Sequence, residues 1–315
     1  MSNKVSQLGD KHTNSFFQQA WWLEAVAQNS WDEVRVEVDG ELRARLPFVV
    51  QKRRGLTVLT MPPLTQTLGP WWLESEGKSA TRLAREKELM SALIEQLPEH
   101  DYFSQSFHYS VTNALPFYWA GFDIHVRYTY IFEQLDLDTI WAEFQKNIRS
   151  HIRKAEKQVE VRDDLGIDAF IEVNTLTFER QGLTLPYSHD LVYRIEEACV
   201  QQEARRIFFA QDAQGRVHAA VYLVWDEAAA YILMSGGDPE LRSSGATSLL
   251  IWRAIQFAAE VTRSFDFEGS MLEPVERRNR AFGAQQTPYL QVKRMNKRAE
   301  LLYTGRNLLK TVLGR

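Results

Sequence analysis

The sequence predicts an α/β protein in which one unit of strands and a helix occurs twice around a mixed sheet. Two hairpin patterns support this prediction. DGELRARLPFVVQ (39–51) is typical of an Asp-Gly turn followed by an alternating strand, and QGRVHAAVYLVW (214–225) repeats that design. A loop, an amphipathic helix and a short strand follow each hairpin, so the order β-β-α-β occurs twice.

The remaining elements follow from apolar spacing in each half. The matching segments are 56–61 and 228–235 for the second hairpin strand, 80–97 and 244–260 for the helix, and 102–107 and 264–269 for the closing strand. We therefore expect two domains, residues 1–140 and 141–295, followed by a basic amphipathic helix over residues 296–315.

The composition is that of a globular protein. The chain has 315 residues, 44% of them hydrophobic and 25% charged, a length that favours about two domains. It contains no run of about eighteen apolar residues and no signal-peptide pattern at its start, which predicts a cytoplasmic protein. The lone cysteine, Cys199, follows Leu191 and Ile195 at helical spacing and is expected to pack in the core.

Motifs for metals and bound cofactors are missing from the sequence. The histidines are scattered, and neither a P-loop nor a GxGxxG motif occurs. If the protein is an enzyme, we expect it to work without a metal, a bound redox cofactor or a covalent intermediate.

One segment, FQKNIRSHIRKAEKQV (144–159), concentrates positive charge, with five Lys or Arg in sixteen positions of a chain whose net charge is −4. An α-helix turns about 100° per residue, which places Ile148 and Ile152 on one side and Arg149, Arg153 and Lys157 on the other. The basic side is either a solvated face or a phosphate-binding surface. Because the helix joins the two halves, we expect it to bridge them and to line a ligand site.

NALPFYWAGF (113–122) resembles the late segment of GNAT acyltransferases, and RNRAFGAQQTPY (278–289) resembles a worn copy of it. Two tandem GNAT-like domains joined by an IRKAEK helix resemble the Fem family, which adds amino acids to peptidoglycan precursors. Related acyltransferases occur in exopolysaccharide and cell-envelope biosynthesis. The resemblance covers roughly residues 15 to 295 and implies an acyltransferase of this kind.

The resemblance also implies a donor. In ordinary GNAT enzymes a Q/R-x-x-G-x-G/A loop wraps the pyrophosphate of coenzyme A, and here Arg242, Ser244 and Gly245 occupy that loop, with Thr247 at the last small position. Fem enzymes that bind transfer RNA through a coiled-coil arm need a long heptad insertion, which this chain lacks. Acyl-coenzyme A is therefore favoured as co-substrate over aminoacyl-tRNA.

Acyl transfer needs a base, a stabilised carbonyl oxygen and an acid. Glu268 is the expected base and Asp266 the second choice, because SFDFEGS alternates carboxylates with aromatics; the alternative is that both carboxylates face solvent or pair with the basic helix. Backbone N–H groups at Ser235 and Gly236 are expected to hold the carbonyl oxygen, unless the glycines only end a strand. Tyr289 is either the acid or a packed tyrosine.

For the acceptor, we expect a nucleotide- or lipid-linked sugar whose diphosphate binds the basic helix. The residues expected to bind it are Arg149, Arg153, Lys154 and Lys157. Trp71 and Trp72 would stack on sugar from the opposite wall, or anchor a loop. The segment from Lys293 to Arg315 has seven Lys or Arg against Glu300 alone, which favours contact with the inner face of a membrane or packing on protein.

These observations predict an N-acyltransferase that transfers an acyl or aminoacyl group to an amino sugar or peptide of a cell-envelope or polysaccharide precursor. The alternative is a non-catalytic glycan- or nucleic-acid-binding protein on a decayed fold of this type. The acidic net charge argues against nucleic acid other than transfer RNA, because backbone binding needs a broad basic surface.

Overall fold

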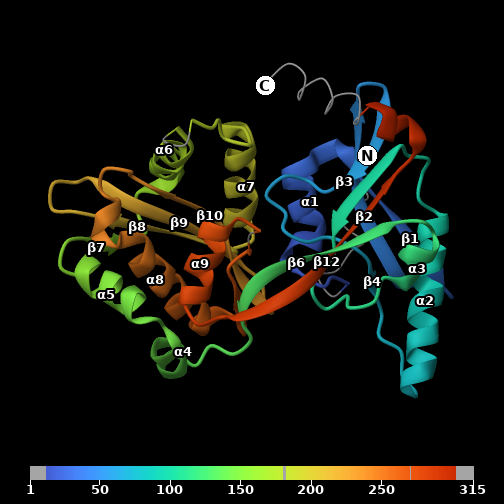
Figure 1. The fold of residues 1–315 in the computed structure, drawn as a ribbon, viewed down its shortest axis with the longest axis horizontal. Coiled ribbons are helices and arrows are strands. Elements are labelled where there is room, and N and C mark those ends of the chain that lie inside the picture. The colour runs from blue at the N-terminus through green and yellow to red at the C-terminus, as the bar shows by residue number, and fades with distance from the viewer. Residues whose placement is uncertain (1–11, 180–181, 270, 303–315) are drawn as a thin grey trace. The chain divides into compact units, whose positions relative to one another are not determined.

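A computed structural model describes residues 12–179, 182–269 and 271–302. The chain forms two compact units, one of residues 1–127 with 288–315 and the other of residues 128–287 (Figure 1). We call them unit 1 and unit 2. Two strands, β6 (Asp123–Phe132) and β12 (Gln285–Met295), have residues in both units.

Unit 1 is a sheet with strand order β1-β2-β3-β5-β12, in which β4 also pairs with β2. Its other elements are α1 (Ala20–Ala27), β1 (Trp31–Val38), β2 (Glu41–Arg53), β3 (Leu56–Thr60), β4 (Trp71–Trp72), α2 (Ser79–Glu95), β5 (Tyr102–Ser106) and α3 (Leu115–Trp119). Asp39 and Gly40, with φ of 55° and 80°, form the tight turn between β1 and β2 that the sequence predicts.

Unit 2 has strand order β6-β11-β10-β9-β8-β7. Its elements are α4 (Leu137–Glu143), α5 (Lys146–Ala155), β7 (Glu160–Arg162), α6 (Gly166–Glu179), α7 (His189–Gln201), β8 (Arg205–Gln211), β9 (Val217–Trp225), β10 (Ala229–Gly237), the 3-10 turn η4 (Arg242–Ser244), α8 (Ala246–Val261), β11 (Ser264–Asp266) and α9 (Glu273–Ala281).

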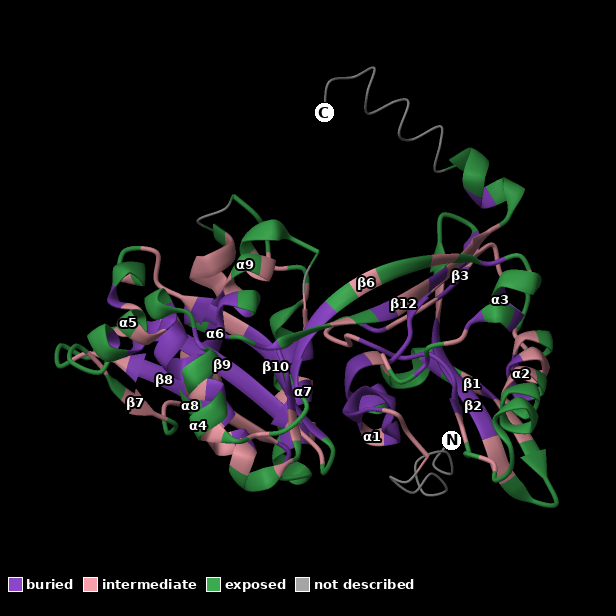
Figure 2. Cartoon of the chain, turned by 60° about the horizontal axis from the view of Figure 1, so that its bottom comes forward, coloured by how far each residue is buried: buried purple, intermediate pink, exposed green. Residues whose placement is uncertain are grey.

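Helices cover both faces of the unit 2 sheet, and the central strands are buried between them (Figures 1 and 2). On one face Ile148 and Ile152 of α5 join Leu250 of α8 in a single apolar cluster with alternate residues of the strands. On the other face, Phe170 of α6 packs edge-on against Tyr222 of β9, with ring centroids 5.5 Å apart. The α4, α5 and α8 layer therefore lies opposite the α6 and α7 layer.

The predicted repeat is present. Strand pair β2-β3 is followed by α2, β5, α3 and β6, and strand pair β9-β10 by α8, β11, α9 and β12. The closing strand of the second half is shorter than expected, because β11 ends at Asp266 instead of continuing to residue 269. A helix beginning at residue 297 continues to 302, and the rest of the expected C-terminal helix lies outside the described residues.

The boundaries of the two units differ from the single boundary at residue 140 that the sequence led us to expect. The end of β6 pairs with β11, Phe132 lying opposite Phe265, so residues 128–132 belong to unit 2. Strand β12 pairs with β5 through Gln291 to Met295, so this strand returns to unit 1. Each half of the sequence therefore contributes the later part of its last strand to the unit formed mainly by the other half.

Candidate active site at the diverging strands of unit 2

Strands β10 and β11 run parallel for only three residues and then diverge. They pair through Ala229–Tyr231 and Ser264–Asp266. Strand β10 then continues alongside β9 as far as Gly237. The chain after Asp266 turns instead toward β6, where the Phe267 N–H donates to the Tyr130 carbonyl at 3.0 Å.

Glu268 lies on this diverging stretch and is held there by a small hydrogen-bond network. Asp266, which is 1% exposed, accepts hydrogen bonds from the Glu268 N–H at 2.8 Å and from the Thr129 hydroxyl. The Gly269 N–H donates to the same hydroxyl at 2.8 Å. Glu268 has φ of 51°, a conformation that non-glycine residues adopt rarely and that is common at functional sites.

Glu268 is a half-buried residue whose Oε1 atom is buried. Its Oε1 atom has no hydrogen-bond partner among the described residues. Burial, and secondly the negative charge of Asp266, raise the pKa of Glu268 well above its usual value. A buried carboxyl group with a raised pKa suits a proton acceptor, which makes Glu268 a stronger candidate base than Asp266, whose carboxylate serves the backbone of the turn.

Tyr187 and Asn174, which the sequence did not indicate, form a hydrogen-bonded chain to β10, and the charge of Glu268 acts on Tyr187. The Tyr187 hydroxyl donates to Asn174 Oδ1 at 2.9 Å, and Asn174 Nδ2 donates to the Ser235 carbonyl at 2.9 Å. Burial, with a smaller contribution from the Glu268 charge, raises the pKa of Tyr187 to about 12. Neither residue belongs to a recognisable motif, so no local signal in the sequence points to them.

The end of β10 is covered by α6. A Cβ atom on Gly236 would lie 2.6 Å from the Asn174 Cα atom, so glycine is required by the approach of the helix. The Gly237 N–H donates to the Thr177 hydroxyl at 2.9 Å. The prediction that N–H groups at Ser235 and Gly236 stabilise a carbonyl oxygen remains a prediction.

The expected phosphate loop joins η4 to α8. Arg242 is exposed and Ser244 is buried, and the Ser244 hydroxyl accepts from the Ala246 N–H at 3.3 Å. Gly245, with φ of 83°, caps α8, and a Cβ atom there would lie 2.5 Å from the His151 carbonyl oxygen of α5. Helix α5 therefore packs directly against the loop.

The basic helix α5 has the predicted apolar seam, since Ile148, Ile152 and Ala155 are buried. Among the described residues its cations form no ion pair with Asp266 or Glu268, so the alternative that these carboxylates pair with the basic helix is not supported. Helices α5 and α8 share an apolar cluster with Phe265 and Phe267, the neighbours of Asp266 and Glu268, whereas the charge of Glu268 acts on Tyr187, which follows α6. The prediction that Arg149, Arg153, Lys154 and Lys157 bind an acceptor diphosphate stays a prediction.

The remaining predicted residues lie in unit 1. Trp71 is 7% exposed and packs edge-on against His12, while Trp72 packs partly buried on the core of that unit. Tyr289 is 5% exposed, and its hydroxyl accepts a hydrogen bond from Arg127 Nε at 3.3 Å. Their proposed roles in sugar stacking and as the acid stay predictions.

Cys199 packs in the core as predicted, and burial raises the pKa of its thiol. In the part of the chain that the structure describes, no group of three or more His, Cys, Asp or Glu residues is placed to hold a metal ion. Within the same residues, none of the helices has the length and hydropathy needed to cross a membrane.

Hairpins, a central pair of diverging strands and a helix-capping turn after β10 define a GNAT-type fold, and the same order of elements occurs in both halves. The family model described as Acetyltransferase (GNAT) domain matches residues 142–272, which form most of unit 2. Residues 142–272 are thus similar to a GNAT acetyltransferase domain.

Comparison with solved structures agrees with the fold. FemX, 14% identical, superposes with a TM-score of 0.65, covering 89% of this chain and 93% of that one. The C-terminal domain of a putative lysylphosphatidylglycerol synthetase from Agrobacterium fabrum, 11% identical, has a TM-score of 0.54, with 89% of each chain covered. A conserved protein of unknown function from Bacteroides thetaiotaomicron, 11% identical, has a TM-score of 0.52, with 88% and 90% covered. A search of curated proteins found no match.

Proposed function

We propose that this protein is a GNAT-type N-acyltransferase that transfers an acyl group from acyl-coenzyme A to an amino sugar or peptide of a cell-envelope or polysaccharide precursor. The observation that carries the proposal is the Glu268 carboxyl group, whose buried Oε1 lacks a hydrogen-bond partner among the described residues where β10 and β11 diverge. A buried polar atom of this kind is costly unless a ligand completes its hydrogen bonding.

The Glu268 carboxylate can both accept and return the proton that acyl transfer moves. The acceptor nitrogen attacks the thioester carbonyl carbon, the N–C bond forms, and Glu268 takes the proton that the nitrogen loses. The C–S bond then breaks, and the thiolate takes the proton from Glu268. Tyr187 is a poor acid for this step, because its pKa of about 12 exceeds that of a thiol, about 8.5, by several units. Its hydroxyl instead orients Asn174 against β10.

An aminoacyl group from transfer RNA is the rival donor. The GNAT domain over residues 142–272 is compatible with acyl-coenzyme A, and the Fem resemblance is compatible with either donor. A lysylphosphatidylglycerol synthetase shares the fold, so lysyl transfer to a lipid is a further outcome to include. At 11–14% identity the similarity to these structures is evidence for the fold and not for the reaction or the substrate.

The test is transfer from acetyl-coenzyme A to amino-sugar nucleotides and precursor peptides, measured by thiol release and by the mass of the acceptor. Glu268→Gln should lower kcat by about 10²-fold while acetyl-coenzyme A binding is kept. Glu260→Gln, an exposed glutamate of α8, is the matched control and should behave like wild type.

Three results would contradict parts of the proposal. Full activity of Glu268→Gln would remove Glu268 as the base. Transfer from aminoacyl-tRNA and none from acetyl-coenzyme A would change the donor. Tight binding of a glycan or nucleic acid without transfer from either donor would favour the non-catalytic alternative.

A further inference from the structure

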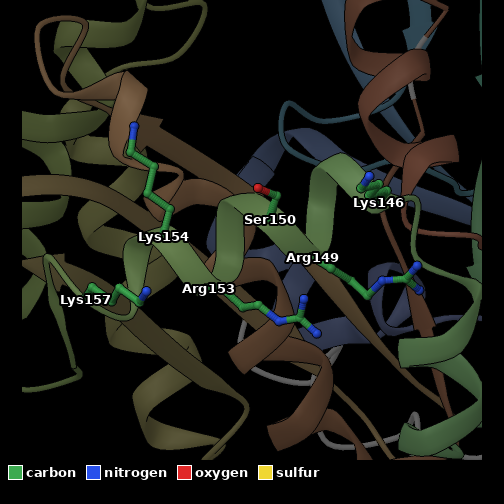
Figure 3. Close-up of a pocket in the computed structure, with 6 residues that line it drawn as sticks. All are labelled: Lys146, Arg149, Ser150, Arg153, Lys154 and Lys157. Carbon is green, nitrogen blue, oxygen red and sulfur yellow. The ribbon is translucent and has the colours of Figure 1, made fainter.

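The outward side of α5 is a row of cations in a shallow hollow (Figure 3). The residues that line it are Lys146, Arg149, Ser150, Arg153, Lys154 and Lys157. From Lys146 to Lys157, just past the end of α5, they extend about 17 Å along the helix axis, since each helical residue rises 1.5 Å. The hollow contains only basic groups and one hydroxyl, so its chemistry favours an anion.

These cations lack carboxylate partners within the described part of the chain, in contrast to six other arginines of unit 2. The paired arginines are Arg162, Arg205, Arg206, Arg216, Arg277 and Arg280. A cluster of like charges without counter-ions opposes folding by self-repulsion. In a chain of net charge −4, such a cluster is expected where an external anion supplies the missing negative charge.

Two of the basic residues already bind the protein backbone. Arg149 donates to the carbonyls of Trp141 and Ala142, at 3.2 and 2.9 Å, and so holds the end of α4. Lys154 donates to the Ser243 carbonyl in the loop before α8. Together with the contact between His151 and Gly245, this bond makes the face of α5 continuous with that loop.

The surroundings of α5 indicate a hydrophilic ligand. Among the described residues, none of the large apolar side chains exposed on the protein belongs to α4 or α5. A helix that inserts into lipid combines its basic residues with exposed apolar ones. Within the described residues, the side chains of Lys146, Arg153 and Lys157 make no hydrogen bond or ion pair, and the Trp141 ring centroid lies 5.9 Å from the Arg153 guanidinium carbon.

We infer that the basic face of α5 anchors the phosphate groups of the nucleotide part of the acyl donor, beside the loop formed by residues 242–247. This inference rests on the proposed function, because it takes acyl-coenzyme A as the donor. It assigns the basic helix to donor binding, whereas the sequence led us to expect that the helix binds the acceptor. The phosphates bind on the α8 side of the sheet, while Glu268 serves the acceptor nitrogen on the α6 side.

The test compares acetyl-coenzyme A with its 3′-dephospho form by calorimetric titration. Arg153→Gln/Lys157→Gln removes two charges that make no hydrogen bond to the protein in the described residues. Arg253→Gln/Arg263→Gln, two exposed arginines at α8, is the charge-matched control. All three proteins are compared at equal ionic strength, with unfolding curves to establish that each is folded.

Wild type should bind acetyl-coenzyme A about tenfold more tightly than the 3′-dephospho form, the loss expected for one charge-assisted contact. The α5 variant should bind acetyl-coenzyme A about tenfold more weakly and no longer distinguish the two ligands, while the control should resemble wild type. If the basic side chains contact the 3′-phosphate, removing either partner abolishes the same interaction, so the effects of the variant and of the missing phosphate are not additive.

An α5 variant that binds both ligands like wild type would overturn the inference and leave the proposed function intact. The inference would equally be overturned if the variant lost only binding to transfer RNA, or only binding to anionic vesicles. If wild type binds no acetyl-coenzyme A, the proposed donor and this anchor are both wrong.

Discussion

At the scale of single residues, Glu268 combines a left-handed backbone conformation with a buried carboxyl oxygen that lacks a hydrogen-bond partner within the described residues. The backbone conformation alone costs on the order of 1–3 kcal/mol. The surrounding network of Asp266, Thr129 and Gly269 maintains that conformation. Local instability of this kind persists where the arrangement serves binding or catalysis.

The raised pKa of Glu268 makes a prediction about stability. In the folded protein Glu268 keeps its proton at a pH where the unfolded chain has lost it, so the folded state binds more protons in that window. Wild type should therefore lose stability relative to Glu268→Gln as pH rises above about 4.3, by up to about 1.4 kcal/mol per pH unit, until the raised pKa is passed.

Urea unfolding of wild type and Glu268→Gln over a series of pH values measures this difference. Parallel stability curves for the two proteins would show that the carboxyl group is not buried as described. Glu260→Gln should run parallel to wild type, because its side chain is exposed on α8.

At the scale of elements, the packing of α6 on β10 and of α5 on α8 decides which groups reach the candidate site. Gly236 lets α6 approach closely enough for Asn174 to bond the Ser235 carbonyl. On the opposite face, Ile148 and Ile152 bury α5 in the cluster formed by α8 and the sheet. The two helices therefore belong to different layers, and their polar groups serve different parts of the reaction.

Gly236→Ala should destabilise the protein by about 1–3 kcal/mol, because the added methyl group would meet the Asn174 backbone at 2.6 Å and push α6 from β10. Gly237→Ala is the matched control, since its nearest neighbour, the His218 carbonyl oxygen, would lie at 3.4 Å. Thermal unfolding of both variants gives the comparison. Equal stability for the two would contradict the described packing of α6.

Ile152→Ala should cost about 2–5 kcal/mol, because its side chain is fully buried between α5 and α8. Lys146→Ala, on the exposed side of the same helix, should change stability by about 0.5 kcal/mol or less. Chemical denaturation of both variants tests whether the seam holds α5 in place. A small effect of Ile152→Ala would mean that α5 is held by its polar contacts instead.

At the scale of the whole molecule, each half of the sequence contributes the later part of its closing strand to the unit formed mainly by the other half. In unit 1, β12 covers the edge of β5 and contributes Val292 to the core. In unit 2, the end of β6 covers β11 and contributes Tyr130 and Phe132. Neither unit is therefore a continuous half of the sequence cut at residue 140.

This arrangement predicts which fragments fold. Residues 128–287 contain every strand of unit 2 and should unfold cooperatively as an isolated fragment. Residues 141–295 lack the end of β6, so the edge of β11 opposite β10 is left unpaired. Circular dichroism and thermal unfolding of the two fragments are the measurements. A cooperative transition in 141–295 and none in 128–287 would contradict the described exchange of strands.

Much of the fold is determined by local pattern. The Asp-Gly turn, the alternating strands and the buried seam of α5 depend on residues within a few positions of each other, so the sequence determined them. The choice of Glu268 over other carboxylates also came from its strand context, and the buried position of its carboxyl group agrees with that choice. Residue type and short spacing are sufficient for features of this range.

Only the tertiary structure decided what lies beside Glu268 and what lies across the sheet from it. Tyr187 and Thr129 reach the site from segments far away in the sequence, and no periodic pattern links them to residue 268. The same holds for the basic helix, whose amphipathic pattern fixes an inner and an outer side but not which face of the sheet it covers. That choice depends on packing against α8, a contact about a hundred residues away in the chain, and such contacts leave no local signal.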